Sequence, residues 1–212
     1  MGSTARALAL ELGPAAGAAP FAAAGFAYVT DFLDGEEERR LLEAIAALDL
    51  REAPYKAYTA RRRIASFGHT YDFSASELKD GPPLPPFLLP LREKAAALLG
   101  EPPSALPHAL VTEYRPGTPL GWHRDTPEFG MVAGISLLGM ARMRFRPYPA
   151  RKGARILHLD LAPRSAYVLR DEVRWAWQHS VAPTRELRYS ITFRTLRRQS
   201  RPKSDSWVEE RQ

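Results

Sequence analysis

The sequence has no cysteine among its 212 residues, which excludes disulfides and thiolate metal sites. A bound metal would therefore need histidine, aspartate or glutamate ligands. No apolar run is long enough to span a bilayer, so we expect no membrane partner. The Ala-rich N-terminus lacks a basic region followed by a compact apolar block, which argues against a signal peptide. The lack of cysteine fits a reducing compartment, and we expect a cytoplasmic protein.

The sequence also has fewer acidic than basic residues, 24 against 30, and its formal net charge is +6. A basic balance favours an anionic partner, above all nucleic acid, although many basic proteins have no such partner. The length suits one domain, and a hydrophobic fraction of 45% is enough for a core. We expect this domain to act as a monomer.

The first half of the chain predicts a leader, a strand and two helices. Residues 1–24 are rich in Ala, Gly and Pro and are expected to be a flexible leader, and residues 26–29 alternate like a strand. Asp34 and Glu37 form a capping-box pattern before apolar residues at helical spacing, which predicts a helix over 35–48. A second helix fits 88–99, between the Pro-rich stretch 81–86 and Gly100.

The second half predicts short strands. Apolar residues alternate with polar ones in runs that Pro and Gly turns separate, at 109–115, 132–138, 141–146, 155–160, 165–170 and 187–196. Six or more short strands without intervening helices indicate an antiparallel sandwich or barrel. The predicted fold class is therefore α+β, with two supporting N-terminal helices on one domain over 25–197. The polar tail, 198–212, is predicted to be flexible.

A candidate metal site begins with His123 and Asp125. In an extended segment residues two apart point to the same side, so both can reach one ion, although such a pair is common by chance. His179, on a later strand, could supply a third ligand or be an ordinary core histidine. Two histidines and one carboxylate leave three positions open on an octahedral ion, as in non-haem Fe(II) oxygenases; a hydrolytic zinc site is the chemical alternative. The remaining histidines are weaker candidates: His69, His108 and His158.

A second candidate site lies in the run from Arg188 to Arg194. Strand alternation places Arg188, Ser190 and Arg194 on one face, with apolar side chains on the other. An ordinary half-buried strand would turn this polar face to water. Because the strand follows His179 closely, the face could instead look toward the metal and bind a dicarboxylic cosubstrate, since arginine offers a planar fork to a carboxylate.

Four segments together resemble the AlkB family of Fe(II)/2-oxoglutarate-dependent dioxygenases. The Tyr-Arg-Pro-Gly turn that begins at Tyr114 leads into the His-x-Asp pair, and residues 133–146 resemble the strands that follow it. His179 stands where the family's distal histidine belongs. The run from Arg188 to Arg194 matches the closing Arg-x-Asn-x-Thr-x-Arg pattern, with Ser190 in place of Asn. The resemblance covers about residues 25–197.

The resemblance implies a double-stranded β-helix, or jelly roll, in which iron and the cosubstrates 2-oxoglutarate and O₂ meet. The implied iron ligands are His123, Asp125 and His179. Arg188, helped by Tyr114, would bind the distal carboxylate of 2-oxoglutarate. Ser190 and Arg194 would complete the pocket near the other end of the cosubstrate, although serine is shorter than the asparagine of the pattern.

The resemblance also implies oxidative demethylation of N-alkylated bases in DNA or RNA, with release of formaldehyde, succinate and CO₂, in repair of alkylation damage or in RNA modification. The target base must be single-stranded or flipped out of a duplex. Residues 68–71 resemble the family's nucleotide-recognition segment, and we expect His69, Tyr71 and Glu128 to contact the substrate, with Tyr71 and His123 on the two faces of the base. Further residues are expected to contact phosphates: Lys56, Arg61, Arg62 and Arg63.

Two other functions stay open at this point. The same oxidase chemistry could act on a protein or a small molecule, because a fold does not fix its substrate. Alternatively, the chain could be a catalytically inert β-sandwich that binds nucleic acid. The complete set of metal ligands and both arginines argue against this second alternative.

Overall fold

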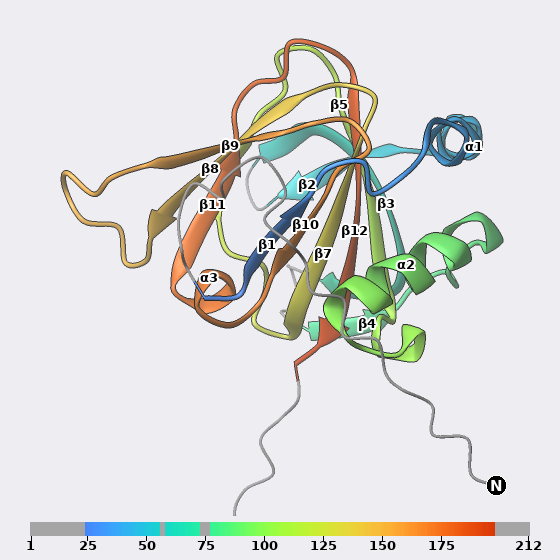
Figure 1. The fold of residues 1–212 in the computed structure, drawn as a ribbon, viewed down its shortest axis with the longest axis horizontal. Coiled ribbons are helices and arrows are strands. Elements are labelled where there is room, and N and C mark those ends of the chain that lie inside the picture. The colour runs from blue at the N-terminus through green and yellow to red at the C-terminus, as the bar shows by residue number, and fades with distance from the viewer. Residues whose placement is uncertain (1–23, 56–57, 73–76, 198–212) are drawn as a thin grey trace, which may run out of the picture.

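The computed structural model describes residues 24–55, 58–72 and 77–197. Two antiparallel sheets face each other and form a jelly roll (Figure 1). The large sheet has the order β1-β10-β7-β12-β5-β3-β2, with β4 paired to β3, and the small sheet has the order β6-β11-β8-β9. The α+β jelly roll that the sequence predicted is confirmed.

The strands of the large sheet are β1 (Phe26–Val29), β2 (Arg51–Tyr55), β3 (Tyr58–Asp72), β4 (Glu77–Asp80), β5 (His108–Tyr114), β7 (Phe129–Leu137), β10 (Ala166–Leu169) and β12 (Arg188–Leu196). The strands of the small sheet are β6 (Leu120–His123), β8 (Ala141–Pro147), β9 (Leu157–Leu161) and β11 (Trp177–Val181). The helices are α1 (Gly35–Ala46), α2 (Leu89–Leu99) and α3 (Asp171–Trp175), with 3₁₀ turns η1 (Pro86–Leu88) and η2 (Pro103–Ala105).

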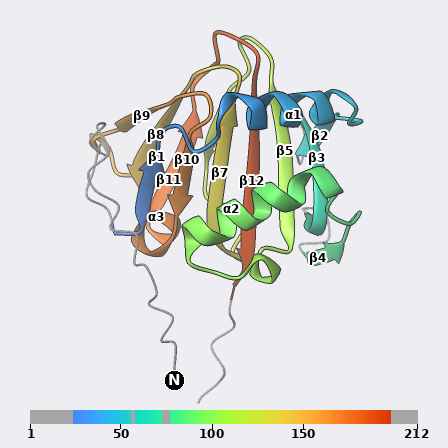
Figure 2. The same ribbon diagram turned by 45° about the vertical axis from the view of Figure 1, so that its right-hand side comes forward.

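Helices α1 and α2 cover one face of the large sheet (Figure 2). Strand alternation turns Ile191 and Phe193 of β12 toward these helices, where both side chains are fully buried. The arginines of the same strand, Arg188 and Arg194, consequently point to the opposite face, between the two sheets. The large sheet therefore separates an apolar core under the helices from a more polar space that the small sheet closes.

A capping box begins α1, as the sequence predicted. The Asp34 carboxylate accepts a hydrogen bond from the Glu37 backbone at 2.7 Å, and the Glu37 side chain accepts one from the Asp34 backbone at 2.9 Å. Lys94 of α2 also contacts both carboxylate oxygens of Glu37 at 2.8 Å. One acidic side chain thus caps α1 and joins it to α2.

Most predicted elements are confirmed, with changed boundaries. The predicted helix 35–48 ends at Ala46, and the strand predicted over 132–138 begins earlier, at Phe129. Helix α3 and the strands β2 and β4 were not predicted. The expected leader up to residue 23, the expected tail, Lys56 and the side chain of Arg61 lie outside what the structure describes. Within the described part of the chain, no helix is long and apolar enough to cross a membrane.

The segment 61–71, which contains most of the expected phosphate and base contacts, needs one correction. It belongs to the long strand β3, which pairs with β5 from Arg63 to Gly68 and therefore lies inside the large sheet. Phe67 packs against the core under the helices. Arg63 points the same way and is bound to the buried Glu113 through two hydrogen bonds of 2.8 and 2.6 Å. Arg63 is therefore not available to phosphates, contrary to the expectation.

Gly68 is the point at which β3 changes partner. Its backbone has a φ of +74°, and a Cβ added there would lie 1.8 Å from the carbonyl oxygen of Pro107. Only glycine fits this close approach. Beyond Gly68 the strand pairs with β4, so that residues 69–72 belong to a hairpin at the edge of the large sheet.

Candidate metal centre

The three residues that the sequence predicts as metal ligands lie together. His123 ends β6, Asp125 follows two residues later, and His179 lies opposite His123 on the neighbouring strand β11. One ligand atom from each of the three side chains lies within 4.8 Å of the others. The centroids of the two imidazole rings are 4.2 Å apart. The pairing of β6 with β11 therefore assembles a candidate triad from segments far apart in sequence.

The protonation of the triad suits a divalent cation. Burial, reinforced by the nearby His123, lowers the pKa of His179 to about 3, so its imidazole is neutral. Burial also lowers the pKa of His123, whose Nδ1 is 2.9 Å from the Gly121 carbonyl oxygen. A hydrogen on Nδ1 that donates to this carbonyl leaves the Nε2 lone pair for a metal. Burial opposes ionisation of Asp125, but Arg194, the two imidazoles and Arg174 together outweigh this effect and lower its pKa.

Arg194 holds the carboxylate of the triad. Its Nε and Nη2 atoms lie 2.8 and 2.7 Å from Oδ1 of Asp125, while Nη1 donates to the Thr192 hydroxyl at 3.0 Å. Nη1 also lies 3.3 Å from Nδ1 of His108, a buried histidine stacked on Phe129. Burial, with a further effect of Arg194, lowers the pKa of His108 to about 2. His108, a weak candidate by sequence, thus supports the site as a neutral neighbour.

A buried cation stands deeper between the sheets. Arg188 is 1% exposed, its Nε donates to the Ser136 hydroxyl at 3.0 Å, and its guanidinium carbon lies 4.9 Å from the centre of the Tyr114 ring. Its Nη1 is buried without a hydrogen-bond partner among the described residues. A buried cation with an unsatisfied donor is well suited to an anionic ligand. This end of the space therefore fits a carboxylate, and the triad end fits a metal.

Comparison with known proteins shows the family of the chain. The model of the 2OG-Fe(II) oxygenase superfamily matches residues 25–194. The chain belongs to this superfamily. The oxygenase therefore uses Fe(II), 2-oxoglutarate and O₂, and the two histidines and one carboxylate are a donor set that suits iron.

Two known proteins are similar to the oxygenase. The oxygenase is 26% identical over 192 residues to uncharacterized protein L905 of Acanthamoeba polyphaga mimivirus, covering 81% of this chain and 85% of that protein. It shares its fold with OsALKBH1 at a TM-score of 0.62 and 16% identity, covering 81% of this chain and 96% of that structure. The Fe(II)/2-oxoglutarate oxygenase that the sequence predicted is thereby confirmed, with a fold like that of OsALKBH1.

Sequence reasoning missed Tyr167, which lies in the same buried space of the oxygenase. The Tyr167 ring lies over Gly134, where an added Cβ would be 2.2 Å from a ring carbon. Burial raises the pKa of Tyr167, while the charge of Arg188 opposes the rise. The strand of Tyr167 looks like an ordinary buried strand, so the only available sequence signal was a glycine inside the strand predicted over 132–138.

The predicted substrate residues of the oxygenase are more scattered. Nδ1 of His69 contacts Asp80 on β4 at 2.7 Å, and Tyr71 lies on the same hairpin opposite Leu78. Glu128 lies in the turn after the triad carboxylate, and one of its carboxylate oxygens is buried without a partner among the described residues. Ser190, predicted to line the cosubstrate pocket, is buried on β12. Their contacts with substrate or cosubstrate stay predictions.

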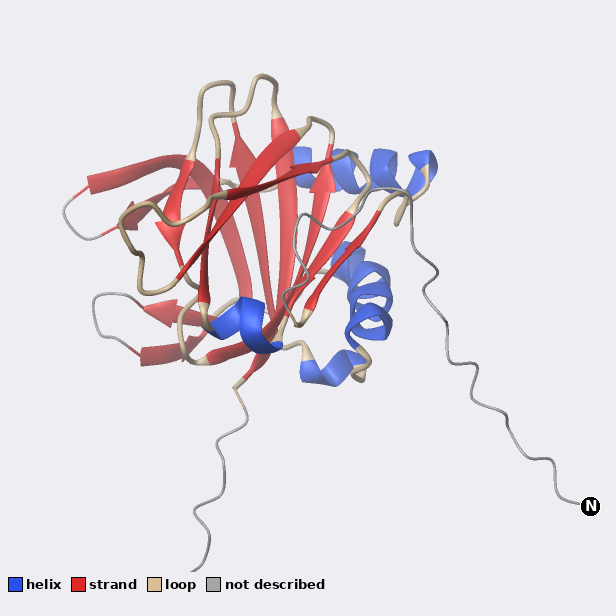
Figure 3. Cartoon of the chain, turned by 60° about the vertical axis from the view of Figure 1, so that its left-hand side comes forward, coloured by secondary structure: helices blue, strands red, loops and turns tan. Residues whose placement is uncertain are grey.

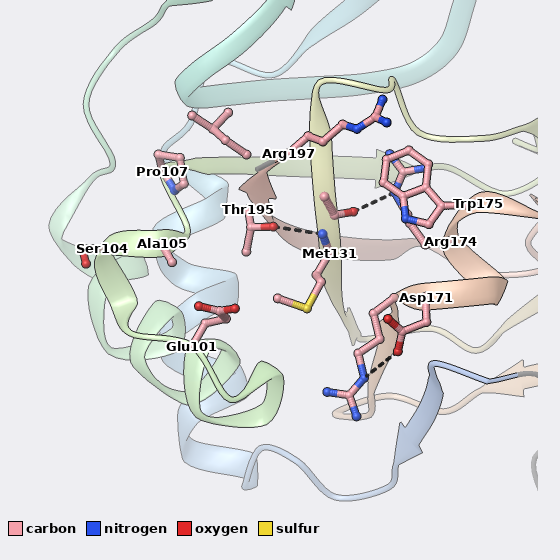
Figure 4. A pocket seen from close by; sticks show the side chains of 13 residues that line it. Glu101, Ser104, Ala105, Pro107, Met131, Asp171, Arg174, Trp175, Thr195 and Arg197 are labelled. Atoms are coloured by element: carbon pink, nitrogen blue, oxygen red, sulfur yellow. Dashed lines mark hydrogen bonds and ion pairs between the residues drawn. The ribbon is translucent and has the colours of Figure 1, made fainter. Parts of the chain in front are cut away.

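A groove of about 700 Å³ lies beside the site, lined by α3, η2 and the ends of β7 and β12 (Figure 4). No residue of the triad is among the described residues that line it. Arg174 connects the groove to the site, because its guanidinium donates to the backbone carbonyls of Thr126, Phe129 and Gly130 at 2.7 to 2.8 Å. Arg174 thus fixes the turn that directly follows Asp125.

Proposed function

We propose that the oxygenase demethylates N-alkylated bases in DNA or RNA. The observation that carries this proposal is the concentration of arginines around one small metal site. Arg194 contacts the triad carboxylate, Arg174 holds the next turn, and Arg124 lies between two of the ligands. An anionic polymer is the substrate class that such an electrostatic environment attracts.

The electrostatic effect of these arginines extends to the triad itself. Burial is the main cause of the lowered pKa of His123, and the positive charges of Arg62 and Arg194 lower it further. Arg62 is the neighbour of Arg63 on β3 but points to the opposite face, as strand alternation requires. Of the two expected phosphate-contacting arginines whose side chains the structure describes, Arg62 is therefore the one that faces the site.

The turn after the triad offers acceptors for a base. One carboxylate oxygen of Glu128 and the hydroxyl of Thr126 are buried without hydrogen-bond partners among the described residues. Unsatisfied buried acceptors cost free energy until a donor reaches them. The exocyclic amino group of an adenine or cytosine is such a donor. This supports the predicted role of Glu128 in reading the base.

When bound together, iron, 2-oxoglutarate and O₂ supply the oxidising power that hydroxylates an N-methyl carbon and yields succinate and CO₂. The hydroxymethyl group then leaves as formaldehyde and frees the base nitrogen. The chain's own residues orient these partners. Arg188 would hold the distal carboxylate of 2-oxoglutarate, His123, Asp125 and His179 would hold iron, and Arg194 keeps the carboxylate in place.

The test is a panel of N-methylated DNA and RNA oligonucleotides with Fe(II), 2-oxoglutarate and air. We expect formaldehyde and demethylated base in equal amounts with at least one substrate, and none with the His179→Ala variant. Unmethylated oligonucleotides are the control. If wild-type protein makes succinate at the same rate with and without every oligonucleotide and releases no formaldehyde, the substrate is a protein or a small molecule.

A matched pair of variants tests the nucleic-acid contact. Arg62→Gln is expected to raise the KM for a methylated oligonucleotide several-fold and leave the KM for 2-oxoglutarate unchanged, because one phosphate contact is lost. Arg63→Gln removes the same charge one residue away on the opposite face of β3 and should affect stability instead. Equal oligonucleotide KM values for the two variants would place Arg62 outside the nucleic-acid interface.

A further inference from the structure

The outer face of the small sheet carries a row of arginines. Strand β8 alternates strictly, with Met143 and Phe145 buried between the sheets and Arg142, Arg144 and Arg146 on the other side. Successive outward side chains on a strand are about 7 Å apart. Figure 3 is turned toward this side of the molecule. The row is rigid because β8 is paired on both edges, with β11 and β9.

Two of these arginines keep an uncompensated charge. Arg144 donates from Nε to the Ser180 hydroxyl at 3.0 Å, and Arg146 donates from Nε to the Gln178 amide oxygen at 2.8 Å. Both partners are neutral, and neither arginine has an ion pair with another described residue. These contacts use only Nε, so the outer nitrogens of each planar fork stay available for a ligand.

The third arginine provides an internal contrast. Arg142 forms two hydrogen bonds with the Asp160 carboxylate on β9, at 2.7 and 2.9 Å. Its charge is therefore neutralised locally, although it lies on the same strand and the same face as Arg144 and Arg146. The face thus concentrates net positive charge toward one end of β8.

An indole completes this arrangement. The guanidinium carbons of Arg146 and Arg144 lie 4.4 and 5.3 Å from the centre of the Trp122 ring. Such cation–π contacts orient arginine side chains that would otherwise move freely in solvent. We name the surface formed by Trp122, Arg144 and Arg146 the small-sheet arginine face.

This face lies directly behind the metal centre. Trp122 precedes His123 on β6, and Gln178 precedes His179 on β11, so alternation places them on the opposite side of the sheet from the ligands. Strand β6 is an edge strand of the small sheet. A bound polymer strand that crosses this edge would pass from the metal centre to the arginine face. Arg124, which is exposed and stacked 3.7 Å above the Tyr148 ring, extends the positive charge beyond β6.

We propose that the small-sheet arginine face binds the phosphate backbone of the single strand whose target nucleotide occupies the metal centre. This inference rests on the proposed function for the target nucleotide. A guanidinium whose outer nitrogens are open binds a phosphate with two parallel hydrogen bonds. Charge complementarity and an adjoining aromatic ring are the features that proteins use to follow a single strand.

The experiment compares the double variant R144Q/R146Q with the control variant R142Q. Binding of a fluorescent single strand of about 20 nucleotides is measured by anisotropy between 0.1 and 1 M salt, without iron. Each lost phosphate contact flattens the log–log salt dependence by about 0.7. The slope of log Kd against log salt should therefore be smaller by about 1.4 for the double variant. Over that tenfold range of salt, the Kd of the double variant should then rise about 25-fold less than the Kd of the wild type. R142Q should retain the wild-type slope, since its charge is already neutralised.

Activity on substrates of two lengths separates this face from the catalytic site. A methylated nucleoside carries no phosphate, so the double variant should demethylate it as wild type does, while its KM for the long strand rises. An unchanged salt slope in R144Q/R146Q, or an equal loss in R142Q, overturns the proposal even if the oxygenase demethylates nucleic acid. Polyglutamate that displaces the strand from wild type but not from the double variant would make the face a general site for acidic polymers and also overturns it.

The two proposals fail in different ways. If no methylated oligonucleotide is demethylated but the double variant loses the expected slope, the demethylation proposal is wrong and the arginine face is still a nucleic-acid surface. If wild-type protein binds no single strand at any salt concentration, both proposals are wrong. Thermal unfolding of each variant checks that the substitutions leave the sheet folded.

Discussion

Replacing Arg188 by methionine should separate stability from cosubstrate binding. In the structure this arginine is 1% exposed, and its Nη1 has no hydrogen-bond partner among the described residues. Removing a guanidinium from water costs several kcal/mol in a real protein. The hydrogen bond to Ser136 and the contact with Tyr114 return roughly 1–3 kcal/mol together. Methionine fills much of the same length without a charge, so we expect Arg188→Met to stabilise the protein without 2-oxoglutarate by about 1–2 kcal/mol.

The same substitution should have the opposite effect on the stability of the protein with 2-oxoglutarate bound. A ligand at 100 times its Kd stabilises a protein by about 2.7 kcal/mol, which is roughly 5–11 °C in Tm for a domain of this size. Loss of the cation should weaken binding at least about a hundredfold, or roughly 3 kcal/mol. At the same concentration of 2-oxoglutarate, the ligand would then stabilise the variant by only about 0.4 kcal/mol, or roughly 1–2 °C in Tm.

The assay is thermal unfolding with Fe(II) under anaerobic conditions, with and without 2-oxoglutarate. Arg188→Lys is the matched control, because it keeps the charge but lacks the planar fork and should recover only part of the ligand-dependent shift. A methionine variant that is less stable than wild type without ligand would show that Arg188 is already satisfied in the fold. A variant that keeps the full shift with 2-oxoglutarate would move the cosubstrate pocket elsewhere.

Three further variants test the site and its support. His179→Ala should abolish tight Fe(II) binding in a metal titration while the circular dichroism spectrum stays unchanged, because one of three ligands is lost. Gly134→Ala should lower the free energy of unfolding by about 1–3 kcal/mol, since the new Cβ would lie 2.2 Å from a ring carbon of Tyr167. Glu113→Gln should lower stability by about 1–3 kcal/mol at pH 7, because Arg63 loses a largely buried partner. The hydrogen bond from Arg63 lowers the pKa of Glu113, so this stability is present above the ordinary carboxyl pKa and disappears as pH falls through the lowered value.

Each of these expectations has a contrary result. Near-wild-type iron affinity in His179→Ala would remove that histidine from the ligand set. An unchanged unfolding midpoint in Gly134→Ala would mean that Tyr167 moves aside without cost. For Glu113→Gln, a stability deficit that persists at acid pH would show that the loss comes from packing rather than from the ion pair.

The sequence predicted His123 and Asp125 as a pair of metal ligands because their geometry is local. His123 and Asp125 are two residues apart in extended backbone, so a period of two places both on one side. The same period separated the apolar residues of β12 from Arg188 and Arg194. The capping box at Asp34 likewise depends on residues within one helical turn. Patterns of this kind survive in the fold because neighbouring residues alone determine them.

Alternation along β3 shows where the sequence was insufficient. The predicted phosphate contacts include both Arg62 and Arg63, but residues one apart in a strand point to opposite faces. Which of these faces meets the site does not follow from the sequence. The packing of Phe67 under the helices and the pairing of Arg63 with Glu113 decided this. Gly68 then ends the pairing with β5 because of a close contact with residue 107, which is distant in sequence.

By itself, the sequence determined the donor chemistry, the strand periods and the excess of positive charge. Only the tertiary structure decided which charges are compensated and which groups meet. Arg194 lies on Asp125, and His108 and Tyr167 lie in the site, because strands far apart in the chain pair in one register. Burial then changes the energetics, since a charge or a donor costs little in water and several kcal/mol between two sheets. Such costs depend on neighbours that only the folded chain brings together.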